Sequence, residues 1–148
     1  RPWMGPKFWC PEMVNIADHN NTKVFRYADA ILMMAECYLE LDDTDNAMRY
    51  LNMVKDRAQI ARYETFKNYD HLHEEIERER ARELFGEFQR KYDLVRWGSW
   101  YRQTFDYTDY KSLQDNILPC HEYYPIPDKE VTYSGNALDN DAYAEWGL

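Results

Sequence analysis

Apolar residues recur with helical spacing along much of this chain and predict a helix pair followed by a long third helix. In the first helix, residues 24–41, one face gathers Ala28, Ile31, Leu32, Ala35, Tyr38 and Leu39. Asp43 then supplies a side-chain oxygen that can cap the next helix. That helix, residues 45–59, would bury Ala47, Leu51 and Val54. Residues 24–59 are therefore predicted to form an antiparallel helix pair.

The spacing within this pair is that of a tetratricopeptide repeat. Its small and large core positions are filled by Ala35, Tyr38, Ala47, Leu51 and Val54. The two alanines would let the helices approach closely. One repeat cannot bury both of its faces alone, so a further helix must pack against it.

The third helix, predicted over residues 70–98, has two apolar arcs on a helical wheel. The broad arc contains Ala81, Leu84, Phe85, Phe88, Tyr92 and Val95, and the second contains Leu72, Ile76, Leu94 and Trp97. Glu79, Glu83 and Arg90 fall within the second arc. Because an unpaired buried charge costs several kcal/mol, about 3–5, these three side chains must find partners.

The remaining segments have no sustained period. Residues 1–23 are predicted to be an irregular lead-in, and residues 99–148 an aromatic loop followed by an extended strap. Within the strap, Pro125 and Pro127 each disfavour helix at the preceding residue. The predicted fold is all-α, a tetratricopeptide-like helix pair packed on a long helix, in one domain spanning residues 1–148.

Charge and cysteine content narrow the function classes. The net charge of −9 argues against binding to nucleic acid or to an anionic membrane surface. Cys37 lies at a helical position and is interpreted as a small buried residue, whereas pairing of Cys10 with Cys120 is left open. No ligand spacing supports a metal site, and no cofactor is expected.

Four carboxylates, Glu75, Glu79, Glu83 and Glu87, form an i, i+4 ladder on the third helix. As paired acids they could hydrolyse glycosidic bonds across a cleft. We favour a structural network instead, because carboxylates stacked on one packed helix do not flank a cleft. The predicted network comprises Glu79, Arg80, Glu83, Glu87, Arg90, Asp93 and Arg96, with no catalytic residue.

The aromatic loop leaves two interpretations open. Flat rings match the apolar faces of sugars, so Trp100, Tyr101, Tyr107 and Tyr110 could form a carbohydrate-stacking platform. The same rings could simply pack a long loop.

Three ordered motifs carry a family resemblance. The stretch from Glu79 to Gly98 follows the pattern E-R-x-R-E-L-x-x-E-x-x-R-x-x-D-L-x-R-W-G. It is similar to the C-terminal signature of the SusD/RagB family of outer-membrane nutrient-binding lipoproteins. Arg26-Tyr27-Ala28-Asp29 and Tyr124-Pro125-Ile126-Pro127, the latter followed by Asn136, Asn140 and Tyr143, resemble the family's earlier helix and its tail. Two positions depart from the family pattern. The family commonly has an aromatic residue at the position of Gly86 and a glycine at the position of Phe88.

The resemblance implies a C-terminal fragment of a larger, non-catalytic protein that binds oligosaccharides or other nutrients at the cell surface. Its implied partner is a SusC-like TonB-dependent transporter, and a lipid anchor outside this fragment would attach it to the outer membrane. In that family the glycan-contacting arc is largely built by earlier segments, so this part would be mainly scaffold. The alternatives are a tetratricopeptide scaffold for a protein partner and a glycan hydrolase that uses the glutamate ladder.

Overall fold

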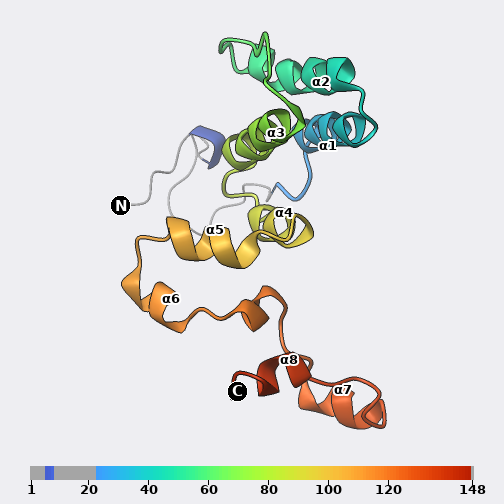
Figure 1. Cartoon of the computed structure of the whole chain (residues 1–148), viewed down its shortest axis with the longest axis vertical. Coiled ribbons are helices and arrows are strands. Elements are labelled where there is room, and N and C mark those ends of the chain that lie inside the picture. The colour runs from blue at the N-terminus through green and yellow to red at the C-terminus, as the bar shows by residue number, and fades with distance from the viewer. Residues whose placement is uncertain (1–5, 9–22, 148) are drawn as a thin grey trace. The chain divides into compact units, whose positions relative to one another are not determined.

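The computed structural model describes residues 6–8 and 23–147, and these residues contain helices and no strands. The predicted all-α class is therefore confirmed (Figure 1). The chain forms two compact units, the first ending at Phe88 and the second beginning at Gln89. Most of the predicted lead-in, including Cys10, lies outside the described residues.

The first unit contains a short 3-10 helix, η1 (Pro6–Phe8), and three α-helices. These are α1 (Tyr27–Glu40), α2 (Thr44–Arg57) and α3 (Tyr69–Glu83). Asp43 caps α2 as predicted, since its side chain accepts from the Asn46 backbone N–H at 3.1 Å. The cap of α3 is Asn68, whose side chain accepts from the His71 N–H at 3.0 Å.

The core of this unit confirms the tetratricopeptide-like helix pair. α1 packs along α2, and α3 packs against both (Figure 1). The buried residues of the cluster are Leu32, Ala35, Leu39, Ala47, Leu51, Val54, Leu72 and Ile76. Ala35 and Ala47 are both fully buried, which fits a close approach of α1 and α2. Cys37, expected to be buried, is exposed on α1.

The prediction of one continuous helix over residues 70–98 is wrong in the middle of that range. α3 ends at Glu83, and α4 (Arg90–Arg96) starts after a turn. Gly86 and Phe88 in this turn have left-handed backbones, with φ of +75° and +63°. A Cβ on Gly86 would also meet the end of the Phe8 ring at 2.5 Å, so a larger residue there would require that ring to shift.

The turn also corrects the two-arc interpretation. Phe85, Phe88 and Tyr92 of the broad arc are exposed, because no continuous helix holds them on one face. The second arc is the more buried one, since Leu72, Ile76 and Leu94 are core residues, whereas the broad arc buries Leu84.

The second unit continues from α4 through short helices. They are α5 (Trp100–Tyr107), α6 (Lys111–Asn116), the 3-10 helix η2 (Pro119–Glu122), α7 (Asp128–Tyr133) and α8 (Asp141–Ala144). α5 packs against α4 and η2 around Leu94, Trp100 and Ile117. Most of the segment expected to be an aromatic loop is thus the helix α5.

The extended strap is confirmed between η2 and α7. Residues 123–127 contain no helix, and Pro127 has φ −56° and ψ 137°. Asn140 forms two hydrogen bonds with the backbone of Ile126, at 2.8 and 2.9 Å. The Tyr143 hydroxyl donates to the Tyr123 carbonyl at 2.5 Å. Two polar side chains of the tail therefore hold the strap in place.

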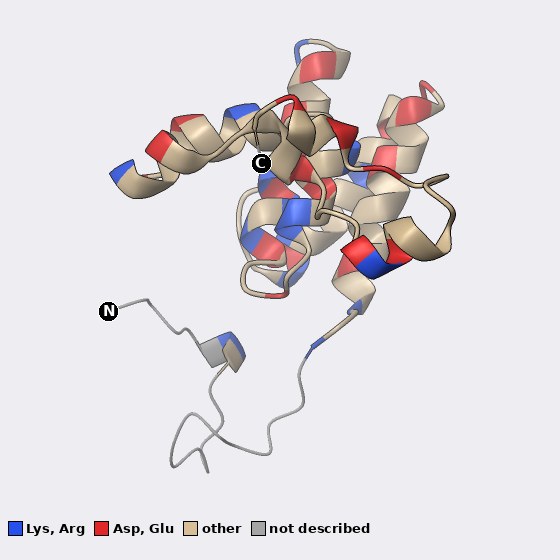
Figure 2. Ribbon diagram, turned by 90° about the horizontal axis from the view of Figure 1, so that it is seen from below, with Lys and Arg blue, Asp and Glu red and all other residues tan. Residues whose placement is uncertain are grey.

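Acidic and basic residues are interspersed along the helices (Figure 2). Within the described residues, no helix has both the length and the apolar character needed to cross a membrane.

Candidate functional site

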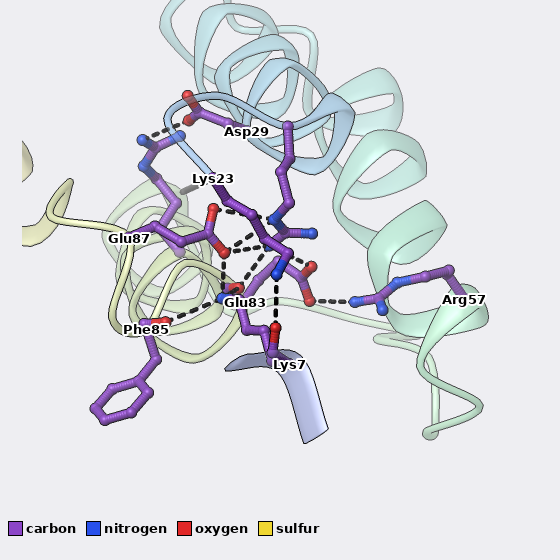
Figure 3. A network of polar contacts seen from close by, with 9 residues as sticks. Lys7, Lys23, Asp29, Arg57, Glu83, Phe85 and Glu87 are labelled. Carbon is purple, nitrogen blue, oxygen red and sulfur yellow. Dashed lines mark hydrogen bonds and ion pairs between the residues drawn. The ribbon is translucent and has the colours of Figure 1, made fainter. Parts of the chain in front are cut away.

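A cluster of charged side chains joins the residues before α1 to the C-terminal end of α3 (Figure 3). Arg26 lies at its centre. Its Nε donates to both carboxylate oxygens of Glu87 at 2.9 Å. Its Nη2 lies 2.9 Å from the carboxylate of Glu83 and donates to the Glu83 carbonyl at 2.8 Å. One guanidinium therefore holds two members of the glutamate ladder.

Lys7 adds a contact from η1 to the same end of α3. Its Nζ donates to the backbone carbonyls of Glu83 at 2.7 Å and Phe85 at 3.0 Å, and it also pairs with the Glu87 carboxylate. The last carbonyls of an α-helix have no partner within the helix, and the Glu83 carbonyl accepts from both Arg26 and Lys7. Lys23 in turn donates to the Lys7 carbonyl at 2.6 Å.

Glu87 remains ionised in this setting although it is only 3% exposed. Burial pushes its pKa upward, but the hydrogen bonds from Arg26 and Lys7 outweigh that effect, and the pKa falls below its ordinary value. The same contact with Glu87 raises the pKa of Arg26. Both groups are thus held in their charged forms.

The other ladder carboxylates also have partners. Glu79 pairs with Arg82 at 3.2 Å. Glu75 accepts from the Tyr63 hydroxyl and from Arg78, the latter at 2.5 Å. Burial raises the pKa of Glu75, yet these two hydrogen bonds outweigh it and lower the pKa overall. The ladder is therefore occupied by ion pairs and hydrogen bonds along its length.

Arg80 forms a second link between α3 and α1. Its Nη2 lies 2.8 Å from the carboxylate of Asp29, and both residues are buried. Replacing either partner would leave the other charge buried without its counter-ion, which is typically more damaging than losing a surface pair.

The remaining residues of the predicted network belong to the second unit. Arg90 donates to the Gln103 side chain at 2.9 Å, and Arg96 donates to the Asp93 carboxylate at 3.1 Å. Asp93 is buried, whereas the side chain of Arg96 is largely exposed.

A hollow of about 900 Å³ opens beside the Arg26 cluster in the first unit. Its lining residues come from η1, from the residues before α1, from the C-terminal ends of α2 and α3, and from the turn after α3. They are Lys7, Phe8, Lys23, Arg26, Arg57, Ala81, Arg82, Glu83 and Phe85. We call this feature the Arg26 hollow.

The four candidate stacking residues differ in exposure. Trp100 is a core residue that packs against Leu94 and Ile117. Tyr101 is half-buried and lies beside Phe105, with ring centroids 6.0 Å apart. Tyr107 and Tyr110 are 82% and 75% exposed. Of the four, these last two have ring faces available to a ligand.

The sequence did not identify the partners of Glu83 and Glu87. The structure places Arg26, Lys7 and Arg57 there. A signal existed at the start of α1, where Arg26 and Asp29 lie one turn apart and match the opposite charges of Glu83 and Arg80 on α3. For Lys7, distant in sequence and outside any periodic segment, no local signal was present.

No group of three or more histidine, cysteine, aspartate or glutamate residues that could hold a metal ion occurs in the described part of the chain. Cys120 is buried there, whereas Cys10, the other cysteine of the pairing left open above, lies outside that part.

Comparisons with known proteins agree on one family. The model of the SusD family matches residues 13–143. The SusD-like protein P25 of Formosa agariphila is 38% identical over 95% of this chain, which corresponds to 28% of that protein. A crystal structure of a SusD superfamily protein from Bacteroides vulgatus superposes with a TM-score of 0.66 at 33% identity. That match covers 75% of this chain and 25% of the other. The chain thus spans about a quarter of the length of these relatives.

Proposed function

The chain belongs to the SusD family, and from this premise we propose that it is the scaffold part of a non-catalytic protein that binds carbohydrates or similar nutrients for uptake. Because the chain spans about a quarter of its relatives' length, ligand and partner concern the whole protein. The partner is a SusC-like TonB-dependent transporter. The site of action is the outer membrane at the cell surface, reached through a lipid anchor outside this chain.

The state of the glutamate ladder carries the non-catalytic part of the proposal. Glycoside hydrolysis needs two carboxyl groups facing each other across a substrate, one of them free to transfer a proton. Here Glu83 and Glu87 converge on the same guanidinium, that of Arg26. Their carboxylates tie α3 to the residues before α1, which is what a scaffold requires.

Binding without turnover can be tested on the full-length natural protein. Calorimetry against a panel of oligosaccharides would find the bound glycan, and chromatography of the same samples after a day would detect cleavage. We expect saturable binding of at least one glycan and its complete recovery. Release of shorter products in excess of the protein, abolished by Glu79→Gln, would contradict the proposal and favour a hydrolase.

A further inference from the structure

We propose that the Arg26 hollow binds the negatively charged group of an acidic oligosaccharide, a carboxylate or a sulfate ester on a sugar ring. The inference goes beyond the scaffold role and rests on the proposed function only for the carbohydrate nature of the ligand. The anionic character of the ligand follows from the lining residues themselves.

Positive charge predominates at the hollow, unlike in the chain as a whole. Among the described residues, the lining contains the cations Lys7, Lys23, Arg26, Arg57 and Arg82 and one carboxylate, that of Glu83. Adding the buried partners Glu79 and Glu87 still leaves the cations in excess. In a chain with a net charge of −9, this excess gives the hollow a local positive potential that favours an anion.

Arg57 and Arg82 still have donors to offer. The side chains of Arg57 and Arg82 are 61% and 56% exposed. Arg57 uses one terminal nitrogen, Nη2, on Glu83. Arg82 uses Nη1 on Glu79 and also forms a side-chain hydrogen bond with Tyr63. A guanidinium carries five N–H donors arranged as a fork that fits a carboxylate or sulfate. Each arginine can therefore bind an anion without giving up its glutamate.

The other cations shape the site rather than contact the ligand. Arg26 and Lys7 direct their donors to Glu83, Glu87 and backbone carbonyls. Glu83 lies between Arg26 and Arg57 and pairs with both, so it fixes the Arg57 side chain on the α2 side of the hollow (Figure 3). Such support lowers the ordering cost that a free arginine would incur on binding.

The apolar part of the lining explains why the anion should be carried on a ring. Phe8, Ala81 and the exposed Phe85 contribute apolar surface next to the cations. A pyranose has apolar faces that pack on such surfaces, whereas a free inorganic anion would leave them uncovered. The volume of about 900 Å³ lies within the range of roughly 300–1,000 Å³ that small-molecule sites occupy.

Calorimetry on the full-length natural protein tests the inference with matched probes. Trigalacturonate and a sulfated galactose disaccharide represent the two anionic groups, galactotriose is the neutral counterpart, and sodium sulfate is the free anion. We expect at least one acidic sugar to bind about ten-fold more tightly than galactotriose and than sulfate. A charge-assisted hydrogen bond is worth about 1.5–3 kcal/mol, so Arg57→Gln should weaken that binding about ten-fold or more.

Three controls separate charge recognition from loss of folding. Arg57→Lys keeps the charge and should retain part of the affinity. Arg62→Gln removes an exposed arginine that pairs with Asp56 outside the hollow lining, and should leave the affinity unchanged. The melting temperature of each variant should match that of the natural protein, because the Arg57–Glu83 pair is largely exposed on the arginine side.

Equal affinity for acidic and neutral sugars, or an Arg57→Gln variant that binds as the natural protein does, would overturn the inference. Binding of an octaglutamate peptide without binding of either acidic sugar would also overturn it, in favour of a protein partner. A protein that binds neutral glycans from the panel but fails these tests would lose the anion site and keep its proposed function.

Discussion

Arg26 shows how one side chain can organise the first unit. Its planar guanidinium donates in parallel to both oxygens of Glu87 and also reaches Glu83. A lysine at this position could supply the charge but not the fork geometry. Because Glu83 is the last residue of α3 and Glu87 lies in the turn that follows, this one residue fixes the end of α3 against the start of α1.

Replacing Glu87 by Gln should make the stability of the chain less dependent on pH. The folded protein lowers the pKa of Glu87, so the stabilisation is complete above the ordinary glutamate pKa of 4.5 and is lost as the pH falls through the lowered value. We expect Glu87→Gln to cost about 3 kcal/mol at pH 7, the lower end for a broken buried pair, and much less at pH 3. Urea unfolding of both proteins at pH 7 and pH 3 measures this change in the free energy of unfolding.

Glu74→Gln on α3 is the matched control. Glu74 is exposed and pairs with Arg78, so its replacement should change the free energy of unfolding by no more than about 0.5 kcal/mol at either pH. Equal losses for Glu87→Gln at pH 7 and pH 3 would show that the contact works through shape rather than charge.

Phe88→Gly should stabilise the chain. Phe88 has a left-handed backbone with φ +63° and is 80% exposed, so it bears a strain of about 1–2 kcal/mol with little packing in return. Glycine removes the strain but costs about 0.5–1 kcal/mol more chain entropy on folding. The expected net gain is about 0.5–1 kcal/mol, read as a higher urea midpoint. A lower midpoint would mean that the Phe88 ring makes contacts that matter.

The same residue explains why the turn after α3 was not predicted. Gly86 alone is a known helix-breaking signal, yet the surrounding apolar period continues through Phe85, Phe88 and Tyr92 and favours one long helix. A phenylalanine in a left-handed conformation leaves no sequence signal of its own. The family resemblance did indicate a turn here, since the family commonly has glycine at the position of Phe88.

At the scale of helices, the pair α1–α2 was predictable because its signals agree. Apolar period, small residues at the contact and the Asp43 cap all indicate the same two helices, and the structure has them within a few residues of the predicted ends. The segment after Gly98 offered only aromatic and polar residues without a clear period. Its short helix α5 was therefore missed, as was its packing on Leu94 and Ile117.

The carboxylates of the candidate site were predictable from the sequence, but their partners were not. The ladder carboxylates are visible as an i, i+4 series in the sequence, three of them on α3 and Glu87 in the turn after it, and the need for partners follows from burial. The identity of those partners depends on long-range packing, since Lys7 and Glu87 are 80 positions apart in the sequence. Local patterns carry no information about such pairs.

Ala47→Leu tests the close contact of α1 with α2. Ala47 is fully buried in the cluster that contains Ala35, and no room remains for a larger side chain without displacement of the helices. Overpacking of this kind costs about 1–3 kcal/mol, and urea unfolding should show a loss of that size. Ala30→Leu on the exposed side of α1 should be nearly neutral. Equal effects of the two substitutions would place Ala47 away from the helix contact.

For the whole molecule, the two units differ in the size of their cores, in their ion pairs and in their exposed aromatic residues. The first unit has the larger core and the ion pairs that join α1, α2 and α3. The second has a small core and exposed aromatic residues, among them Tyr107 and Tyr110. If this segment is scaffold, those two rings do not belong to the neutral-glycan site of the full-length protein, whatever the Arg26 hollow adds for acidic sugars.

The most direct test of the scaffold role is the affinity of the full-length natural protein for its neutral glycan when both rings are removed. Stacking is worth about 1–3 kcal/mol per ring, by analogy with bases on aromatic side chains, so two contacting rings would cost roughly 30-fold or more. We predict that a Tyr107→Ala, Tyr110→Ala double variant keeps the calorimetric affinity within about two-fold. A loss of about ten-fold or more with an unchanged melting temperature would contradict the scaffold role and place the carbohydrate site in this segment.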